Sequence, residues 1–176
     1  LYQRDKFRYL GHAEQPVRFT RKQHKHTRNI LHVWGEVLTG DRLDVFVCHF
    51  PSRYGGEKES EPDRFDAART LRSLCDSVYA LRPAPHILIM GDFNDTPDDI
   101  SIRQILDAHP FPIRWASVPD SMRIESQTDR HPFLRLCNLF AERKTHPSGS
   151  HKYQGEWSQL DQIIISSALA DTTAAM

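Results

Sequence analysis

Residues 87–95 read ILIMGDFND, an apolar run that ends in a glycine and is followed by Asp92 and Asn94. A short apolar run bounded by turn residues predicts a buried strand, and Gly91 permits a tight turn at its end. In α/β sheets, ligands bind beyond the carboxyl ends of strands. A carboxylate and an amide two residues apart can hold a hard cation or a water and donate a hydrogen bond to an oxyanion. An Asx turn that caps the strand explains the same pair equally well.

Two further apolar segments precede this strand and predict a β-hairpin. Residues 29–37 read NILHVWGEV and residues 43–50 read LDVFVCHF, and the turn formers Gly40 and Asp41 lie between them. The second segment is apolar nearly throughout. We therefore expect it to be a central strand that is covered on both faces.

The segment between the hairpin and residues 87–95 predicts the longest helix of the chain, over residues 61–81. Apolar side chains recur along it every three or four residues, which is the spacing of an amphipathic helix. The capping pattern at residues 60–63 marks the expected start. Arg64 and Asp66 fall on the polar face and are expected to face solvent.

Toward the C-terminus the predicted elements are shorter. Residues 98–107 predict a short helix, residues 110–148 predict long surface connections with one short apolar piece, and residues 152–157 and 160–166 predict two strands. Alternation of strands and helices is typical of an α/β layered fold. At this length we expect one domain over residues 1–176.

Three more polar side chains lie at or near predicted strand ends. His49 can donate to a phosphate or act as an acid or base near neutral pH, or it can make a single backbone hydrogen bond. Arg53 offers a planar fork for phosphate, although a lone arginine is more often a surface charge. Asp161 opens an apolar strand, where a buried carboxylate requires a partner. That partner is either a histidine that Asp161 orients or a backbone amide.

Composition excludes several classes of protein. The chain has 176 residues, 39% of them hydrophobic, with 23 Lys and Arg against 23 Asp and Glu. It is therefore neither disordered nor a histone-like polycation. No apolar run approaches the roughly 20 residues that span a bilayer. The three cysteines lie among apolar neighbours without a CxxC motif, which predicts small buried side chains rather than disulfides or a metal site.

Charge is uneven along the neutral chain. Residues 1–32 hold eight Lys or Arg against two acidic residues. Such a basic segment can attract phosphates or nucleic acid, or it can be a solvated loop between strands. Both readings stay open.

Three motifs in this order resemble the endonuclease/exonuclease/phosphatase superfamily, which has the fold of deoxyribonuclease I. They are HxPS at residues 49–52, GDFN at residues 91–94 and LDxIxxS at residues 160–166. The similarity covers roughly residues 28–168 and is greatest to a bacterial branch. It implies a four-layer α/β sandwich of two mixed β-sheets flanked by helices, incomplete at both ends of this chain.

The resemblance also implies roles for the site residues. Asp92 matches the aspartate that orients or deprotonates the attacking water, and Asn94 matches the amide that holds this water and the phosphate. His49 matches the histidine that contacts the scissile phosphate, and Asp161 matches the aspartate that pairs with a catalytic histidine. Members of the superfamily use Mg²⁺ or Mn²⁺ to stabilise charge on the phosphate. Asp92 is the one candidate metal ligand in this chain.

Two parts of the family pattern are absent from this sequence. The family has a strand with an Asn and a segment with a metal-binding Glu before a stretch that resembles residues 1–7 here. It has Ser-Asp-His after the LDxIxxS strand, and no Ser-Asp-His occurs in this chain. We therefore expect an internal part of a longer protein, inactive by itself.

Two hypotheses of different classes follow. The first is a divalent-metal-dependent hydrolase of phosphoric esters, foremost a phosphodiesterase or endonuclease in the complete protein, with Arg53 as a substrate-binding residue. The second is a non-catalytic binding module on the same fold. The substrate of the first is a nucleic acid, a sugar phosphate or a phospholipid head group, and the motifs do not choose among them.

Overall fold

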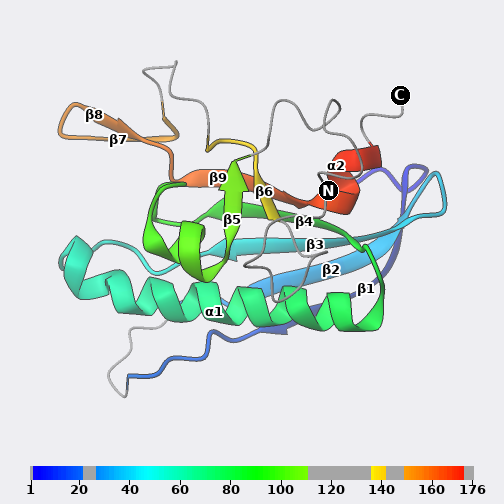
Figure 1. Cartoon of the computed structure of the whole chain (residues 1–176), viewed down its shortest axis with the longest axis horizontal. Helices are drawn as coiled ribbons and strands as arrows, with labels where there is room; N and C mark the ends of the chain where they lie inside the picture. Colours follow the sequence, from blue (N-terminus) through cyan, green and yellow to red (C-terminus); the bar gives the residue numbers. More distant parts are fainter. Residues whose placement is uncertain (1, 22–26, 111–135, 142–148, 173–176) are drawn as a thin grey trace, which may run out of the picture.

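The computed structural model describes residues 2–21, 27–110, 136–141 and 149–172 (Figure 1). These residues form nine strands, two α-helices and one short π-helical turn. In chain order the elements are β1 (Phe7–Gln15), β2 (Ile30–Val37), β3 (Arg42–His49), α1 (Glu57–Leu81), β4 (His86–Asp92), η1 (Ser101–Ile105), β5 (Ala108–Pro110), β6 (Leu136–Asn138), β7 (His151–Tyr153), β8 (Glu156–Ser158), β9 (Asp161–Ser166) and α2 (Ser167–Thr172).

Seven of the strands form one mixed sheet in the order β1-β2-β3-β4-β9-β6-β5, and β7 pairs with β8 in a separate hairpin. Strand β3 runs parallel to β4, while β9 runs antiparallel to β4. The carboxyl ends of β3 and β4 and the first residue of β9 therefore lie at the same end of the sheet, on the left in Figure 1. The β7–β8 hairpin projects from that same end.

The expected hairpin of residues 29–50 is confirmed, because β2 and β3 pair antiparallel. Strand β3 is central, with β2 on one side and β4 on the other. The expectation that it is covered on both faces is wrong for the described residues. Phe46 and Cys48 are buried, whereas Val47 between them is 38% exposed, since consecutive side chains point to opposite faces of a strand.

The long helix is confirmed, but its start and its polar face differ from expectation. It begins at Glu57, directly after Gly56, whose φ of 118° lies where L side chains are rarely found. Ser60 lies inside the first turns and donates to the carbonyl of Gly56, so it is not the capping residue. Arg64 and Asp66 are each 1% exposed, because other elements supply partners for both charges.

The shorter elements match the prediction in part. The helix expected over residues 98–107 is only the π-helical turn η1, and the strand expected over residues 152–157 is the β7–β8 hairpin, turning at Gln154 and Gly155. Strand β5 ends where the long predicted connection begins, β6 lies within it at the predicted short apolar piece, and both join the main sheet. Residues 111–135 and 142–148 of that connection lie outside the described residues.

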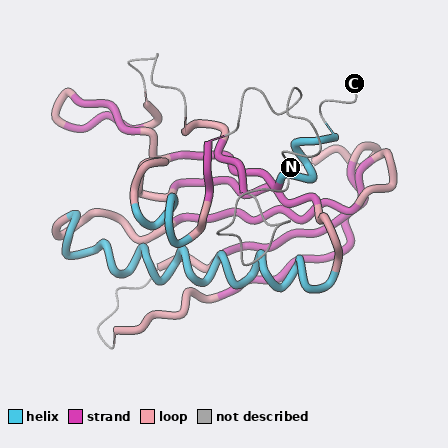
Figure 2. Tube along the Cα trace, viewed as in Figure 1, coloured by secondary structure: helices cyan, strands magenta, loops and turns pink. Residues whose placement is uncertain are grey.

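The main core lies between α1 and one face of the sheet, as Figure 2 shows for the path of the helix. Ala67, Ala68, Leu71, Cys75 and Val78 of α1 pack there against buried strand residues that include Phe46, Ile87, Ile89 and Ile164. A smaller cluster on the other face joins α2 to Leu88, Cys137 and Ile165. The α/β class is confirmed, with one large sheet and one long helix against it. The assignment of residues 1–176 to one domain stays a prediction.

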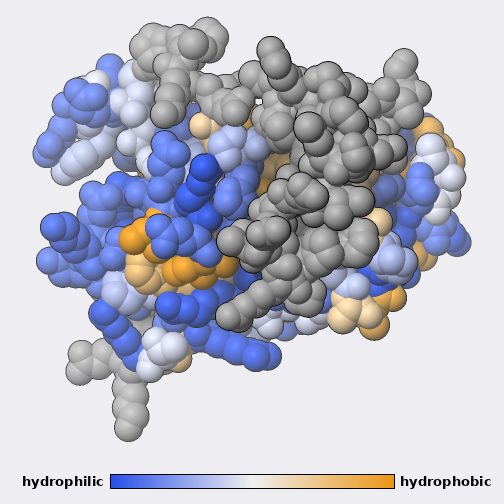
Figure 3. Space-filling view, in the orientation of Figure 1, coloured by the Kyte–Doolittle hydropathy of each residue, from blue (hydrophilic) through white to orange (hydrophobic). Residues whose placement is uncertain are grey.

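The surface and the cysteines agree with composition. Polar residues dominate the helix-side face, with a small apolar patch above the left part of α1 (Figure 3). Cys48, Cys75 and Cys137 are buried and free, and burial raises the pKa of the Cys75 thiol to about 12. No helix among the described residues is long and apolar enough to cross a membrane.

Candidate active site

Three polar side chains stand in one row across neighbouring strands at the left end of the sheet. His49 is paired with Asp92 in the β3–β4 ladder, and Asp92 is paired with Asp161 in the β4–β9 ladder. The Nε2 atom of His49 lies 3.8 Å from Oδ2 of Asp92, and both side chains are about one third exposed. Three neighbouring apolar strands thus place an imidazole and two carboxylates in one row, at the solvent-accessible end of the sheet.

Asp92 and Asn94 are linked by a turn. The backbone N–H of Asn94 donates to Oδ1 of Asp92 at 2.8 Å, and its amide Nδ2 donates to the carbonyl of Phe50 at 3.0 Å. Asn94 has φ +50°, so the two residues do not continue an extended strand. The Asx turn that the sequence left open is therefore present, and it leaves Oδ2 of Asp92 facing His49.

The turn depends on close approach of two backbones at Gly91. Gly91 has φ +139°, and a Cβ atom there would lie 1.9 Å from the carbonyl oxygen of Cys48. Only glycine fits this contact, because any side chain would push β3 and β4 apart. Glycine at this position therefore brings the end of β4 against β3 just before Asp92.

Arg28 reaches the same row from the basic N-terminal segment. Its Nη1 lies 3.3 Å from Nε2 of His49. The two residues line a cavity of about 330 Å³ together with Arg21, Thr27, Ser52 and other residues that include the acidic Glu59 and Asp63. The segment is tied to α1, because Asp66 accepts hydrogen bonds from the backbone and hydroxyl of Thr20. The basic segment is thus docked on the helix at that point, with a guanidinium beside the candidate histidine.

Arg53 faces inward. Its Nε donates to the carbonyl of Asn94 at 2.6 Å, its Nη1 to Glu57 at 2.6 Å, and its Nη2 to Asp95 at 3.2 Å and Asp99 at 3.0 Å. All three nitrogens therefore have protein acceptors. The role of substrate binding that we expected for Arg53 stays a prediction.

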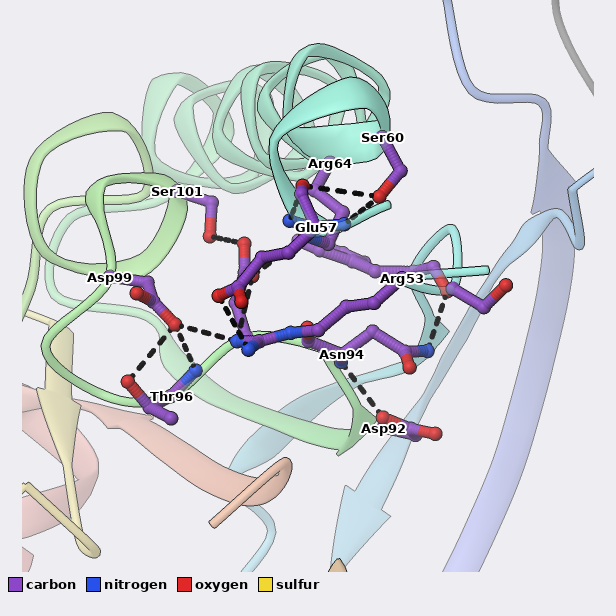
Figure 4. Close-up of polar contacts among 12 residues, drawn as sticks. Arg53, Glu57, Ser60, Arg64, Asp92, Asn94, Thr96, Asp99 and Ser101 are labelled. Atoms are coloured by element: carbon purple, nitrogen blue, oxygen red, sulfur yellow. Dashed lines mark hydrogen bonds and ion pairs between the residues drawn. The ribbon is translucent and has the colours of Figure 1, made fainter. Parts of the chain in front are cut away.

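Arg64, labelled in Figure 4, is a second arginine that donates to Asp95, and it is buried. Arg64 donates from Nε to Oδ1 of Asp95 at 2.7 Å, and Ser101 donates to Oδ2 at 2.6 Å. Burial raises the pKa of Asp95, and the hydrogen bonds and charge of these partners only partly offset that effect. The residue directly after GDFN is therefore a buried carboxylate held by two arginines and a hydroxyl.

Asp161 differs from the environment that its sequence suggests. It is exposed, and in the described part of the chain its carboxylate has no hydrogen-bond or ion-pair partner. The expected burial is wrong because the first residue of β9 lies at the open end of the sheet. The predicted pairing with a histidine stays a prediction.

A second cavity, of about 660 Å³, opens beside Asn94. Arg53, Tyr54, His151, Tyr153 and Ser158 are among the residues that line it. Tyr54 also lines the first cavity. One cavity thus reaches the row at His49, and the other lies beside Asn94.

Comparison with known proteins identifies the family. The model of the Endonuclease/Exonuclease/phosphatase family matches residues 1–176, the whole sequence. The chain belongs to this family. None of the curated proteins searched with the sequence matches it.

Solved structures show the fold of this family. Truncated TDP2 of Caenorhabditis elegans has a TM-score of 0.58 at 15% identity, over 92% of this chain and 53% of that one. The human nocturnin catalytic domain with a bound sulfate anion has a TM-score of 0.56 at 16% identity, over 94% and 50%. The mannosyl-6-phosphatase of Bacteroides thetaiotaomicron has a TM-score of 0.56 at 15% identity, over 94% and 55%. The chain therefore spans about half the length of each, and the family fold predicted from the motifs is confirmed.

The family resemblance implies a divalent metal ion. Within residues 2–21, 27–110, 136–141 and 149–172, no three His, Cys, Asp or Glu side chains stand close enough together to hold one. Asp92 and Asn94 supply oxygen ligands of the type that Mg²⁺ binds, but the set is not complete. We assign no reaction step to a metal ion.

Sequence reasoning brought forward His49, Asp92, Asn94 and Asp161, and the structure gathers them at one edge. Sequence reasoning missed Arg28, Arg64 and Asp95. The basic composition of residues 1–32 was the available signal for Arg28. For Arg64 there was none, because helical periodicity placed it on the outer face.

Proposed function

We propose that this protein hydrolyses phosphoric esters, foremost phosphodiesters, by attack of water on phosphorus at the row of His49, Asp92 and Asp161. The observation that carries the proposal is the register that pairs these residues across β3, β4 and β9. Family membership supports it. So do neighbours of the same fold, one named as a mannosyl-6-phosphatase and another determined with bound sulfate, an anion shaped like phosphate.

In this proposal His49 and Asp92 divide the work. An imidazole N–H can donate to a nonbridging phosphate oxygen, and a carboxylate within one water of the phosphorus can accept the proton of the attacking water. Oδ2 of Asp92 has the freedom for this, because the Asn94 backbone occupies only Oδ1. The 3.8 Å between His49 and Asp92 keeps both groups on one reacting centre.

In this proposal Arg28, rather than Arg53, binds the phosphate of the substrate. Its guanidinium is exposed at the rim of the cavity beside His49, where it can pair with a phosphate oxygen. Arg53 has every nitrogen occupied by protein acceptors. Dependence on Mg²⁺ or Mn²⁺ is part of the proposal and rests on the resemblance.

The test measures hydrolysis by the chain together with any flanking sequence its gene encodes. Substrates are a nitrophenyl diester, a nitrophenyl monoester and plasmid DNA, each with Mg²⁺, Mn²⁺ or EDTA. Asp92→Ala is expected to lower turnover about 10²- to 10⁴-fold, the usual contribution of a general base, with unchanged cooperative unfolding. Asp98→Ala, an exposed aspartate of the same loop, is the matched control and is expected to stay within about twofold.

Two results decide against the proposal. Full turnover by Asp92→Ala overturns the assignment of the site. No turnover of any substrate, by the chain with any flanking sequence its gene encodes, favours the alternative of a non-catalytic binding module on this fold.

A further inference from the structure

The guanidinium of Arg53 is committed to the loop that carries Asn94. Its Nε donates to the Asn94 carbonyl at 2.6 Å, and its Nη2 donates to Asp95 and Asp99 at 3.2 and 3.0 Å. The side chain is 27% exposed and lines the cavity beside Asn94. Nη1 also donates to Glu57 at 2.6 Å, and a planar fork whose three nitrogens all donate to protein acceptors is held in one orientation.

Asn94 has a left-handed backbone, with φ +50°. Asparagine adopts this conformation as a single residue where local hydrogen bonds support it, and three such bonds surround Asn94 here. Asp92 holds the residue from its N–H side, and the Phe50 carbonyl holds its side-chain amide. Arg53 is the group that holds its carbonyl, so it completes the set on the C-terminal side of the turn.

Asp95 passes the restraint to the core. Its Oδ1 is shared by Nη2 of Arg53 and Nε of Arg64, and Arg64 is 1% exposed within α1. The backbone carbonyl of Asp95 also accepts a hydrogen bond from Nε2 of buried Gln162 at 2.6 Å. Because Gln162 follows Asp161 in β9, one cluster ties the Asn94 turn to the strand that presents Asp161.

We infer that Arg53 is a positioning residue, which holds the Asn94 turn in register with the rest of the row through contacts to the Asn94 carbonyl and Asp95. The inference rests on the proposed function for its effect on turnover. It contrasts with the direct phosphate contact that the sequence suggested. Lysine cannot replace arginine here, since a single ammonium cannot span the Asn94 carbonyl and the two carboxylates at once.

The first arm of the test needs no activity. Amide hydrogen exchange is followed by NMR in the wild type, in Arg53→Lys and in the control Arg69→Lys, which changes an exposed arginine of α1. Loss of the restraint is expected to speed exchange of the Asn94 amide at least about tenfold in Arg53→Lys, because local opening sets that rate. The Ile89 amide in the middle of β4 and all amides of Arg69→Lys are expected to be unchanged.

The second arm is kinetic and uses the substrate that the activity screen identifies. A displaced positioning contact lowers kcat, and a shift of about 1 Å can cost about 100-fold. We expect Arg53→Lys to lose about 10- to 100-fold in kcat with KM within about twofold. Free guanidinium ion is expected to restore part of the kcat of Arg53→Ala.

The outcomes separate the alternatives. If Arg53→Lys leaves amide exchange of Asn94 unchanged and raises KM, Arg53 contacts the substrate and the inference is overturned. If the variant leaves both the exchange and kcat unchanged, the inference is also overturned. Faster Asn94 exchange supports positioning even if no substrate is ever turned over, so failure of the proposed function is distinguishable. If Arg53→Lys does not fold, Asp99→Ala removes one acceptor of Nη2 of Arg53, and unchanged Asn94 exchange in that variant counts against the inference.

Discussion

Replacing Arg64 by methionine tests whether the buried arginine stabilises the fold through Asp95. Arg64 is 1% exposed and donates to Asp95, to the Ser60 hydroxyl at 2.7 Å and to the Glu57 carbonyl at 3.0 Å. Methionine keeps the apolar stem in place but removes all three donors. The change therefore leaves a buried carboxylate with fewer partners.

The expected loss of unfolding free energy depends on the partners that Asp95 keeps in Arg64→Met. Removing one partner of a buried ion pair costs about 3–5 kcal/mol of unfolding free energy. Asp95 keeps its contacts with Arg53 and Ser101, so we expect a loss near the lower bound, about 3 kcal/mol. With a urea slope of about 2 kcal/mol per M, the midpoint falls by about 1.5 M.

The control is Arg69→Met on the same helix. Arg69 is 57% exposed and also pairs with a buried carboxylate, that of Asp66. Asp66 keeps its two hydrogen bonds from Thr20, so we expect a loss of less than about 1 kcal/mol.

The assay is urea unfolding followed by circular dichroism and tryptophan fluorescence at pH 7 and at pH 4. Burial already raises the pKa of Asp95, and loss of Arg64 raises it further. A carboxyl with a raised folded pKa binds its proton more readily when folded, so acid favours the folded variant. The difference in unfolding free energy between the wild type and Arg64→Met is therefore expected to be smaller at pH 4 than at pH 7. If Arg64→Met loses no more unfolding free energy than Arg69→Met, the reasoning is refuted.

Two further predictions concern the sheet. Gly91→Ala is expected to destabilise the protein by several kcal/mol, because the new Cβ meets the Cys48 carbonyl at 1.9 Å and overpacking costs about 1–3 kcal/mol beyond the left-handed strain. Gly40→Ala is the control, because Gly40 also has a positive φ of +87° but has open space around it, and we expect it to lose about 1–2 kcal/mol of unfolding free energy. If thermal unfolding shows equal losses for the two variants, the close approach at Gly91 is contradicted. Burial raises the pKa of Asp44, but hydrogen bonds from His32 and Arg82 outweigh burial and hold it below its usual value. Its carboxylate therefore adds stability that is lost as pH falls below about 4. The unfolding free energy of Asp44→Asn is expected to fall less steeply than that of the wild type between pH 5 and pH 2, and parallel profiles would exclude this role.

The elements that rest on local pattern were predictable. An apolar run of four residues before Gly91 predicts β4, and the period of α1 predicts the helix within four residues of its start. The same logic placed His49 and Asp161 at strand ends. Boundaries and faces were less predictable, because helical periodicity cannot show that Arg64 meets Asp95, 31 residues later in the chain.

Backbone preference and hydrophobic periodicity act over a few neighbouring residues. They were therefore enough to predict β2, β3, β4, β9, the long helix and the residue types at the strand ends, and the motifs indicated the family, whereas β1 and β5 were not predicted. Tertiary structure alone decided that His49, Asp92 and Asp161 share one row, since strand order and register arise from contacts between distant segments. Tertiary structure also decided which partner each arginine contacts. Arg53 turns inward to Asn94 while Arg28 reaches His49, because a charge takes the acceptor that the folded chain brings within hydrogen-bond distance.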